Sequence, residues 1–86
     1  MRLEFREQAF EDLQYWVQMN PKVAKRLLRL IEETKRDPFG GAGKAEPLRG
    51  ELSGWWSKRI DQEHRLIYRV EGDSLIVAQA KGHYGD

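Results

Sequence analysis

One carboxylate, one histidine and a group of arginines stand out in this sequence as side chains that could act together. Glu46 lies in the stretch "KAEPLR", His83 lies in the final stretch "AKGHYGD", and several arginines lie between them. Histidine can donate or accept a proton near neutral pH, and a carboxylate completes an acid–base pair. Guanidinium groups bind phosphate oxygens and stabilise the charge that develops on a phosphorane. These residue types suit the cleavage of RNA by its own 2′-hydroxyl, a group that DNA lacks.

Each of these residues also has a simpler explanation. The arginines could form an ordinary solvated strand face, because antiparallel sheets often expose one face to water. A single loop glutamate, or a histidine close to a chain end, is weak evidence by itself. The other histidine, His64, falls among apolar residues and is interpreted as structural. Two histidines without any cysteine, and without an H-x-x-x-H spacing, do not predict a metal site, so no metal is expected.

Composition indicates one small domain that spans residues 1–86 and has a single modest core. Hydrophobic residues make up 40% of the chain and charged residues 34%, which is typical of a folded protein with a highly charged surface. The chain contains no cysteine, its first residues lack the apolar region of a signal peptide, and no apolar run is long enough to span a bilayer. A cytoplasmic protein without membrane association is therefore expected. The net charge is only +1, so a basic binding site must be created by folding.

Two helices are predicted after a short first strand at residues 2–5. Residues 7–18 form an amphipathic helix whose apolar positions are Phe10, Leu13, Trp16 and Val17. Asn20 and Pro21 predict the start of a second helix, with the Asn20 side chain as its cap, and Pro38 ends it. The inward positions of the second helix are Val23, Leu27, Leu30, Ile31 and Thr34.

The second half of the chain is predicted to be β structure that follows a long loop. The stretch "DPFGGAGKAEPLRGELSG" has no clear periodicity, and long loops in small domains tend to be functional. The segments "WWSKRI", "HRLIYRV" and "SLIVAQAKGHY" then read as strands joined by antiparallel hairpins. Of the adjacent Trp55 and Trp56, one is expected in the core, and the other is free to stack on a base or to be covered by a loop. The fold class is α+β: two N-terminal helices packed on a twisted, mainly antiparallel sheet.

Successive side chains of a strand point to opposite faces, so the numbering of the β segments predicts two different faces. The even-numbered face, expected to meet the helices, comprises His64, Leu66, Tyr68, Val70, Ile76, Ala78 and Ala80. The odd-numbered face comprises Ser57, Arg59, Arg65, Arg69, Gln79, Lys81 and His83. This assignment assumes three-residue loops at residues 61–63 and 71–73, because a two-residue loop would mix the faces. It predicts an open cationic face on which Arg59 lies opposite Arg65.

The run "PFGGAGKAEPLRGELSGWWSKRIDQEHRLIY", the preceding "LIEETKRDPF" and the late "HY" closely resemble the YoeB toxins of bacterial toxin–antitoxin systems. These toxins belong to the wider RelE/ParE superfamily. The resemblance covers nearly the whole chain, and the combination of G-K-x-E-P-L, S-G-x-W-S-x-R-I, E-H-R-L-x-Y and H-Y is specific.

The resemblance implies a two-layer RelE-like fold and an enzyme that needs no metal or cofactor. It implies a ribosome-dependent mRNA endonuclease that cuts within the codon in the A site and arrests translation. Carried over by motif, Glu46 is expected to be the general base and His83 the general acid. Arg65 is expected to stabilise the phosphate with help from Arg59, and Tyr84 to help shape the site.

The resemblance also implies partners and further RNA-binding residues. Lys44 and Arg49 flank Glu46 and are expected to bind RNA, with Arg49 standing where the family often has lysine. The expected partners are the 70S ribosome with its mRNA, a cognate YefM-like antitoxin and a second copy of the chain. Operator DNA is expected only as a partner of the toxin–antitoxin complex. One departure is that Gly85 and Asp86 follow the His–Tyr pair with which the family typically ends.

Two other functions stay open on the sequence alone. One is a non-catalytic toxin that binds a protein target, like the gyrase-inhibiting branch of the superfamily. The other is a catalytically inactive protein that binds RNA or the ribosome. The gyrase-inhibiting branch lacks the Glu/Arg/His set, so the combination of Glu46, Arg65 and His83 favours the nuclease.

Overall fold

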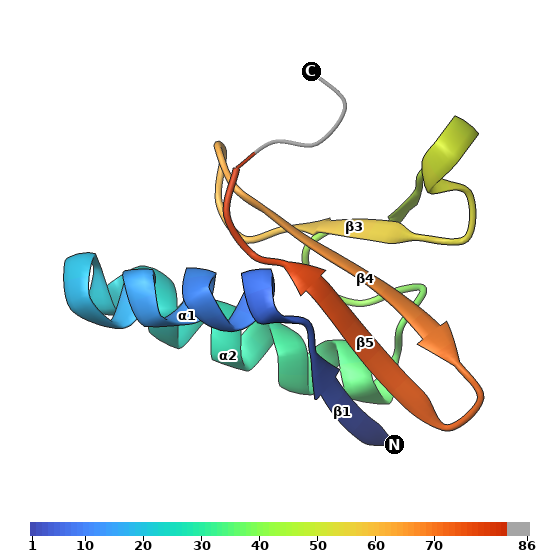
Figure 1. Ribbon diagram of the computed structural model, residues 1–86, viewed down its shortest axis with the longest axis horizontal. Coiled ribbons are helices and arrows are strands. Elements are labelled where there is room, and N and C mark those ends of the chain that lie inside the picture. The colour runs from blue at the N-terminus through green and yellow to red at the C-terminus, as the bar shows by residue number, and fades with distance from the viewer. Residues whose placement is uncertain (83–86) are drawn as a thin grey trace.

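A mixed five-stranded sheet forms one layer of the structure, and two helices packed on one of its faces form the other (Figure 1). This computed structural model describes residues 1–82. Its elements are β1 (Arg2–Phe5), α1 (Glu7–Met19), α2 (Pro21–Arg36), β2 (Glu46–Pro47), the 3₁₀ helix η1 (Gly50–Leu52), β3 (Trp56–Arg59), β4 (Arg65–Glu71) and β5 (Ser74–Gln79). The strand order is β1-β5-β4-β3-β2, and only the β1–β5 pair is parallel. The predicted α+β class, with two N-terminal helices on one face of a mainly antiparallel sheet, is confirmed.

Helix α2 buries the face that its sequence predicts. All five predicted inward residues are buried, from Val23 to Thr34, and they pack against the strands. Pro21 occupies the first turn as expected, but the Asn20 side chain makes no capping hydrogen bond. The Asn20 carbonyl instead accepts the backbone N–H groups of Val23 and Ala24 at 3.0 and 3.2 Å. The helix therefore begins at the predicted residue, but without the predicted cap.

Helix α1 packs through only part of the predicted face. Trp16 is buried and Leu13 packs against the core as expected, whereas Phe10 and Val17 are each more than half exposed, at 53% and 55%. The other buried positions of the helix are Ala9 and Asp12. Phe10 and Leu13 help to line a groove of 460 Å³ between β1, α1 and α2.

The two hairpins of the sheet differ from each other in how well the sequence predicts them. Between β3 and β4, Arg59 lies opposite Arg65, as predicted. Between β4 and β5, Glu71 pairs with Ser74, so the predicted three-residue loop at residues 71–73 is wrong. Gly72 has a φ of +59°, which permits a tight two-residue turn.

This tight turn changes which residues of β5 face the helices. Leu75 and Val77 join the core in place of Ile76 and Ala78, which were predicted there. The register shifts by one residue next to the Ile67/Tyr68 step, as in a β-bulge. Beyond the shift the predicted alternation is restored, and Ala80 is in the core as expected.

Two polar side chains on the helix-facing side of the sheet hold the loop that follows α2. Lys58 is completely buried, and its Nζ donates a hydrogen bond to the Asp37 carbonyl at 3.1 Å. The Tyr68 hydroxyl, also buried, donates to the Pro38 carbonyl. Burial lowers the pKa of Lys58, and burial followed by the nearby Asp37 charge raises the pKa of Tyr68. Within residues 1–82, neither helix combines the length and the apolar character needed to cross a membrane.

The Tyr68 hydroxyl should make folding stability depend on pH above about 10, the ordinary tyrosine value. Because its pKa is raised in the folded state, the unfolded chain releases the phenolic proton first. The contribution of the Tyr68 hydroxyl to the unfolding free energy is therefore fully present below about pH 10. It is lost as pH rises above this value, by up to about 1.4 kcal/mol per pH unit. We expect the difference in unfolding free energy between wild type and Tyr68→Phe to shrink by this amount between about pH 10 and about pH 11 in denaturant titrations. A difference that stays constant over this range would contradict the raised pKa.

Candidate active site

The open face of the sheet, which points away from the helices, brings several predicted site residues together. Glu46 pairs with Ser57, and Ser57 pairs in turn with Ile67, so these three side chains form one row across β2, β3 and β4. Arg59 and Arg65 form the next row on the same face. Glu46 is thus a diagonal neighbour of Arg59, at a backbone separation of about 7–8 Å, within reach of long side chains. The register alone places the candidate base diagonally next to Arg59, with Arg65 one strand further across the same face.

The opposed arginines carry charge that no carboxylate balances among residues 1–82. The ion pairs in that part of the chain join Arg69 to Glu71 and Lys35 to Glu32. Arg59 is exposed, and Arg65 is partly buried with Nη1 donating to the Asp61 carbonyl at 3.4 Å. Like charges directly opposite one another are unfavourable, and an anion between them relieves the repulsion. The pair is therefore suited to bind a phosphate group.

Glu46 is positioned by a loop that is anchored on the sheet just before β2. The Arg59 backbone N–H donates to the Gly43 carbonyl at 2.7 Å. Gly43 has a φ of +86°, and a Cβ added there would lie 3.0 Å from Leu30 Cδ1 and 3.1 Å from Lys58 Cβ. Only glycine fits this position without strain or displacement. The loop therefore closes tightly on β3 and delivers Glu46, exposed, to the open face.

Of the two loop cations predicted to bind RNA, one precedes β2 in the chain and the other follows it. Lys44 directly follows Gly43, the residue bonded to the Arg59 backbone, and it is exposed with a φ of +55°. Arg49 is also exposed, but it comes after β2 and directly precedes η1. The fold thus places Lys44 near the arginine row, and Arg49 beyond the opposite end of β2.

One of the two adjacent tryptophans packs against the core and the other does not, as expected. Trp56 packs against the core and lies 4.7 Å from the Phe39 ring. Trp55 instead lies beneath two guanidinium groups, with Arg6 and Arg69 at 5.0 and 5.2 Å from its ring centroid. Arg69 is therefore engaged by both Trp55 and Glu71. The sequence did not predict the contribution of Arg6, which comes from the β1–α1 junction.

The chain after β5 reaches the arginine row from the other side. The Gly82 carbonyl accepts the Arg65 backbone N–H at 3.0 Å. The Gly82 N–H donates to Nδ1 of His64 at 2.9 Å, so His64 holds the backbone next to the arginine row. Lys81 does not join the cationic face as predicted, because β5 ends at Gln79 and strand alternation no longer applies. Its Nζ lies 4.0 Å from the Tyr15 ring centroid on α1.

The predicted residues His83 and Tyr84 lie outside the described residues. The described chain ends at Gly82, whose carbonyl is bonded to the backbone of Arg65. Among the candidate residues, the structure therefore brings together Glu46, Arg59 and Arg65.

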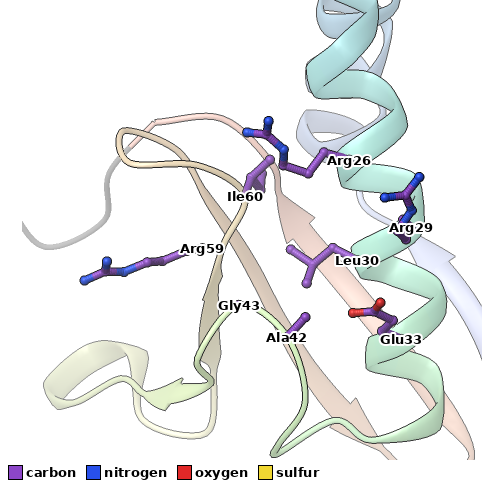
Figure 2. Close-up of a pocket in the computed structure, with 8 residues that line it drawn as sticks. All are labelled: Arg26, Arg29, Leu30, Glu33, Ala42, Gly43, Arg59 and Ile60. Carbon is purple, nitrogen blue, oxygen red and sulfur yellow. The ribbon is translucent and has the colours of Figure 1, made fainter.

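A separate hollow of 360 Å³ lies between α2 and the loop around Gly43 (Figure 2). Arg26, Arg29 and Glu33 line it from the helix. Arg59 and Ile60 line it from the sheet. Figure 2 shows that the Arg59 side chain extends away from the side chains of α2, so the hollow meets the candidate site only at Arg59.

The chain matches a family model described as a YoeB-like toxin of bacterial type II toxin–antitoxin systems, over residues 5–84. A Streptomyces coelicolor relative named toxin YoeB is 50% identical, and the match covers 98% of this chain and all of the relative. The YoeB/ParE toxin from Agrobacterium tumefaciens superposes with a TM-score of 0.94 at 40% identity, covering 98% of this chain and 100% of that one. A YoeB–YefM complex and a YoeB dimer from Staphylococcus aureus have TM-scores of 0.88 and 0.90 at 39% and 38% identity, each covering 98% of both chains.

The fold and these relatives define a toxin of a bacterial type II toxin–antitoxin system. Within that class, the chain belongs to the YoeB-like toxin family.

The arginine pair should act as an anion site that stabilises the folded protein. A ligand that binds only the folded state raises the melting temperature by mass action, so sulfate should stabilise the wild type more than chloride does at matched ionic strength. In Arg65→Ala we expect the difference in melting temperature between sulfate and chloride to fall to half of the wild-type difference or less. Lys25→Ala, which removes an exposed cation from α2, should retain it. Equal gains in Arg65→Ala and Lys25→Ala would show that the arginine row is only a solvated surface.

Proposed function

We propose that this toxin is a ribosome-dependent mRNA endoribonuclease that cleaves mRNA in the ribosomal A site and thereby inhibits translation. The observation that carries the proposal is the strand register, which puts Glu46 beside the opposed Arg59–Arg65 pair on one open face. Membership of the YoeB-like family supports the same activity. An open face, rather than an enclosed pocket, suits a substrate that is presented on a particle much larger than the toxin.

The proposed mechanism divides proton transfer and charge stabilisation among different residues. Glu46 accepts the proton of the RNA 2′-hydroxyl, and that oxygen attacks the adjacent phosphorus. Arg65, assisted by Arg59, stabilises the negative charge that builds up on the phosphate oxygens. His83 protonates the departing 5′-oxygen, so the products are a 2′,3′-cyclic phosphate and a 5′-hydroxyl. Tyr84 shapes the site around the reacting groups.

Substrate binding beyond the reacting phosphate falls to the loop cations. Lys44 directly follows the residue that is hydrogen-bonded to Arg59, so it is suited to bind the phosphate next to the one that is cut. Arg49 lies farther along the loop and would bind RNA or ribosomal surface at a distance from the chemistry.

The proposed partners are a YefM-like antitoxin, the 70S ribosome with mRNA, and a second toxin chain. The Staphylococcus aureus relative has been seen both as a YoeB–YefM complex and as a dimer. Exposed apolar surface on this chain, in the groove of 460 Å³ that Leu3, Phe10 and Leu28 help to line, is consistent with a protein partner. Operator DNA is proposed to bind only the toxin–antitoxin complex, and the ribosomal target places the toxin in the cytoplasm.

The acid–base pair is tested by Glu46→Gln and His83→Gln, each of which keeps the size of the side chain approximately. Loss of general acid or base catalysis lowers the cleavage rate by about 10²–10⁴-fold, so each variant should fall by this range in a reaction with mRNA-programmed ribosomes. Glu51→Gln changes an exposed glutamate on η1 and should cleave at the wild-type rate. Wild-type cleavage by His83→Gln would show that His83 is not the acid.

The nucleophile is tested with mRNA that carries a single 2′-deoxy nucleotide. When the substitution lies on the 5′ side of the cut, cleavage should be lost, because the attacking oxygen is absent. The same substitution one codon away should leave the rate unchanged. Primer extension locates the cut, and chemical probing of the ends should find a 2′,3′-cyclic or 3′-phosphate and a 5′-hydroxyl. Efficient cleavage of the deoxy-substituted codon would eliminate the mechanism.

A further inference from the structure

Three side chains hold the backbone that leaves β5, although this segment is not part of a strand. The Ala80 N–H donates to Asp12 Oδ2 at 2.8 Å, and the Ala80 carbonyl accepts Nε1–H of Trp16 at 2.8 Å. Two residues later, the Gly82 N–H donates to His64 Nδ1 at 2.9 Å. Asp12 and Trp16 come from α1, and His64 directly precedes β4. We call these three residues the clamp.

The clamp replaces a missing strand ladder. Buried backbone N–H and carbonyl groups need partners, and Ala80 is completely buried one residue after β5 has ended. Side chains from a distant part of the sequence supply these partners, since Asp12 and Ala80 are 68 positions apart. Any residue except proline can form the backbone hydrogen bonds of a strand ladder, but a side-chain hydrogen bond requires a particular residue. The path of residues 80–82 therefore depends on the identity of the clamp residues.

The clamp also uses residue types that simple packing would not select. Asp12 is 3% exposed, and burial of a carboxylate is costly unless its oxygens are hydrogen-bonded. Its Oδ1 accepts Nε2 of Gln8 at 2.9 Å, which leaves Oδ2 for Ala80. The Trp16 and His64 rings meet edge to face at 4.7 Å, so each fixes the orientation of the other.

The segment held by the clamp ends at the arginine row. The Gly82 peptide is bonded on one side to His64 and on the other to the backbone N–H of Arg65. Gly82 has a φ of +89°, with nothing within 4 Å of an added Cβ, so the constraint there is backbone conformation and not space. The residue that is joined to His83 in the sequence is thus fixed relative to the residue that carries the proposed phosphate-binding guanidinium.

We propose that Asp12, Trp16 and His64 are positioning residues for RNA cleavage, because they fix the backbone from which the chain continues to His83. This inference rests on the proposed function, in which His83 is the general acid and Arg65 binds the phosphate. A displacement of about 1 Å in a catalytic group can cost about 10²-fold in rate. Loss of a clamp bond should therefore lower kcat, while the affinity for programmed ribosomes, which depends on other surfaces, should be retained.

The experiment compares His64→Phe with His64→Asn. Phenylalanine keeps a ring against Trp16 but has no acceptor for the Gly82 N–H. Asparagine places Oδ1 close to the position of Nδ1 and can accept that bond. We expect amide hydrogen exchange at Gly82, measured by NMR, to be at least about tenfold faster in His64→Phe than in wild type or His64→Asn.

The same variants are then compared in ribosome-dependent cleavage. His64→Phe should lose about 10–100-fold in kcat with KM unchanged, and His64→Asn should stay within about threefold of wild type. A merely structural role predicts the opposite order, because phenylalanine preserves the apolar contacts and asparagine does not. Trp16→Phe, which removes the indole N–H bonded to the Ala80 carbonyl together with one ring of this buried side chain, should also lower kcat at unchanged KM, and it supplies the test if His64→Phe does not fold.

The outcomes separate this inference from the proposed function. If the wild type does not cleave mRNA on ribosomes, the proposed function fails, and with it the catalytic role of the clamp, whatever the exchange rates. If the wild type cleaves, and His64→Phe matches it in both Gly82 exchange and kcat, the clamp proposal is overturned while the nuclease stands. Faster Gly82 exchange with unchanged kcat would overturn the positioning role as well.

Discussion

The register between β3 and β4 fixes which side chains meet the helices and which reach the open face. With Lys58 opposite Leu66, and Arg59 opposite Arg65, one alternation buries an apolar row and exposes a cationic one. A slip by one residue would invert the whole strand, exposing Leu66 and Tyr68 and burying two arginines without partners. The register is therefore specified by burial on one face, and the candidate active site on the other face is its direct consequence. The position of Glu46 depends on it too, because β2 pairs only with β3.

Two irregular segments flank the candidate site, and the fold holds each of them by side-chain hydrogen bonds. Lys58 and Tyr68 bind the carbonyls of Asp37 and Pro38, at the start of the loop that leads to β2. The clamp residues bind the turn after β5 in the same way. All of these anchoring side chains except the half-buried His64 are buried, which limits the competition of water for their bonds. These anchors come from the helix-facing side and from the ends of the strands. On the open face, Ser57 and Ile67 are buried, whereas Glu46 and Arg59 are exposed.

The parts of the fold that were predictable from the sequence are those in which one local signal dominates. The apolar period of α2, and the alternation of "HRLIYRV" around Arg65 and Arg69, were sufficient for the helix and for the first hairpin. The second hairpin was predicted wrongly because both possible loop lengths give an apolar face: "SLIVA" is apolar at odd and even positions alike. The clamp was missed because its residues lie far apart in sequence and Asp12 has the appearance of an ordinary polar helix position. Lys58 was missed because its long apolar stem lets a charged residue occupy an inward position.

The cationic character of the open face comes from pairing and not from composition. Arg65 and Arg69 lie on the same face of β4, four residues apart along the strand. Arg69 is neutralised by Glu71 and packed on Trp55, whereas the recorded side-chain partner of Arg65 is a neutral carbonyl. A chain with a net charge of +1 can thus present unbalanced positive charge at one row of its sheet, because Arg69 on the same strand is paired with Glu71 whereas Arg59 and Arg65 form no ion pair within residues 1–82. Long-range attraction to RNA would then be weak, and selectivity would depend on the close fit of one phosphate between Arg59 and Arg65. This arrangement agrees with the proposed function, in which the ribosome would bring the substrate to the toxin and other RNA would stay uncut.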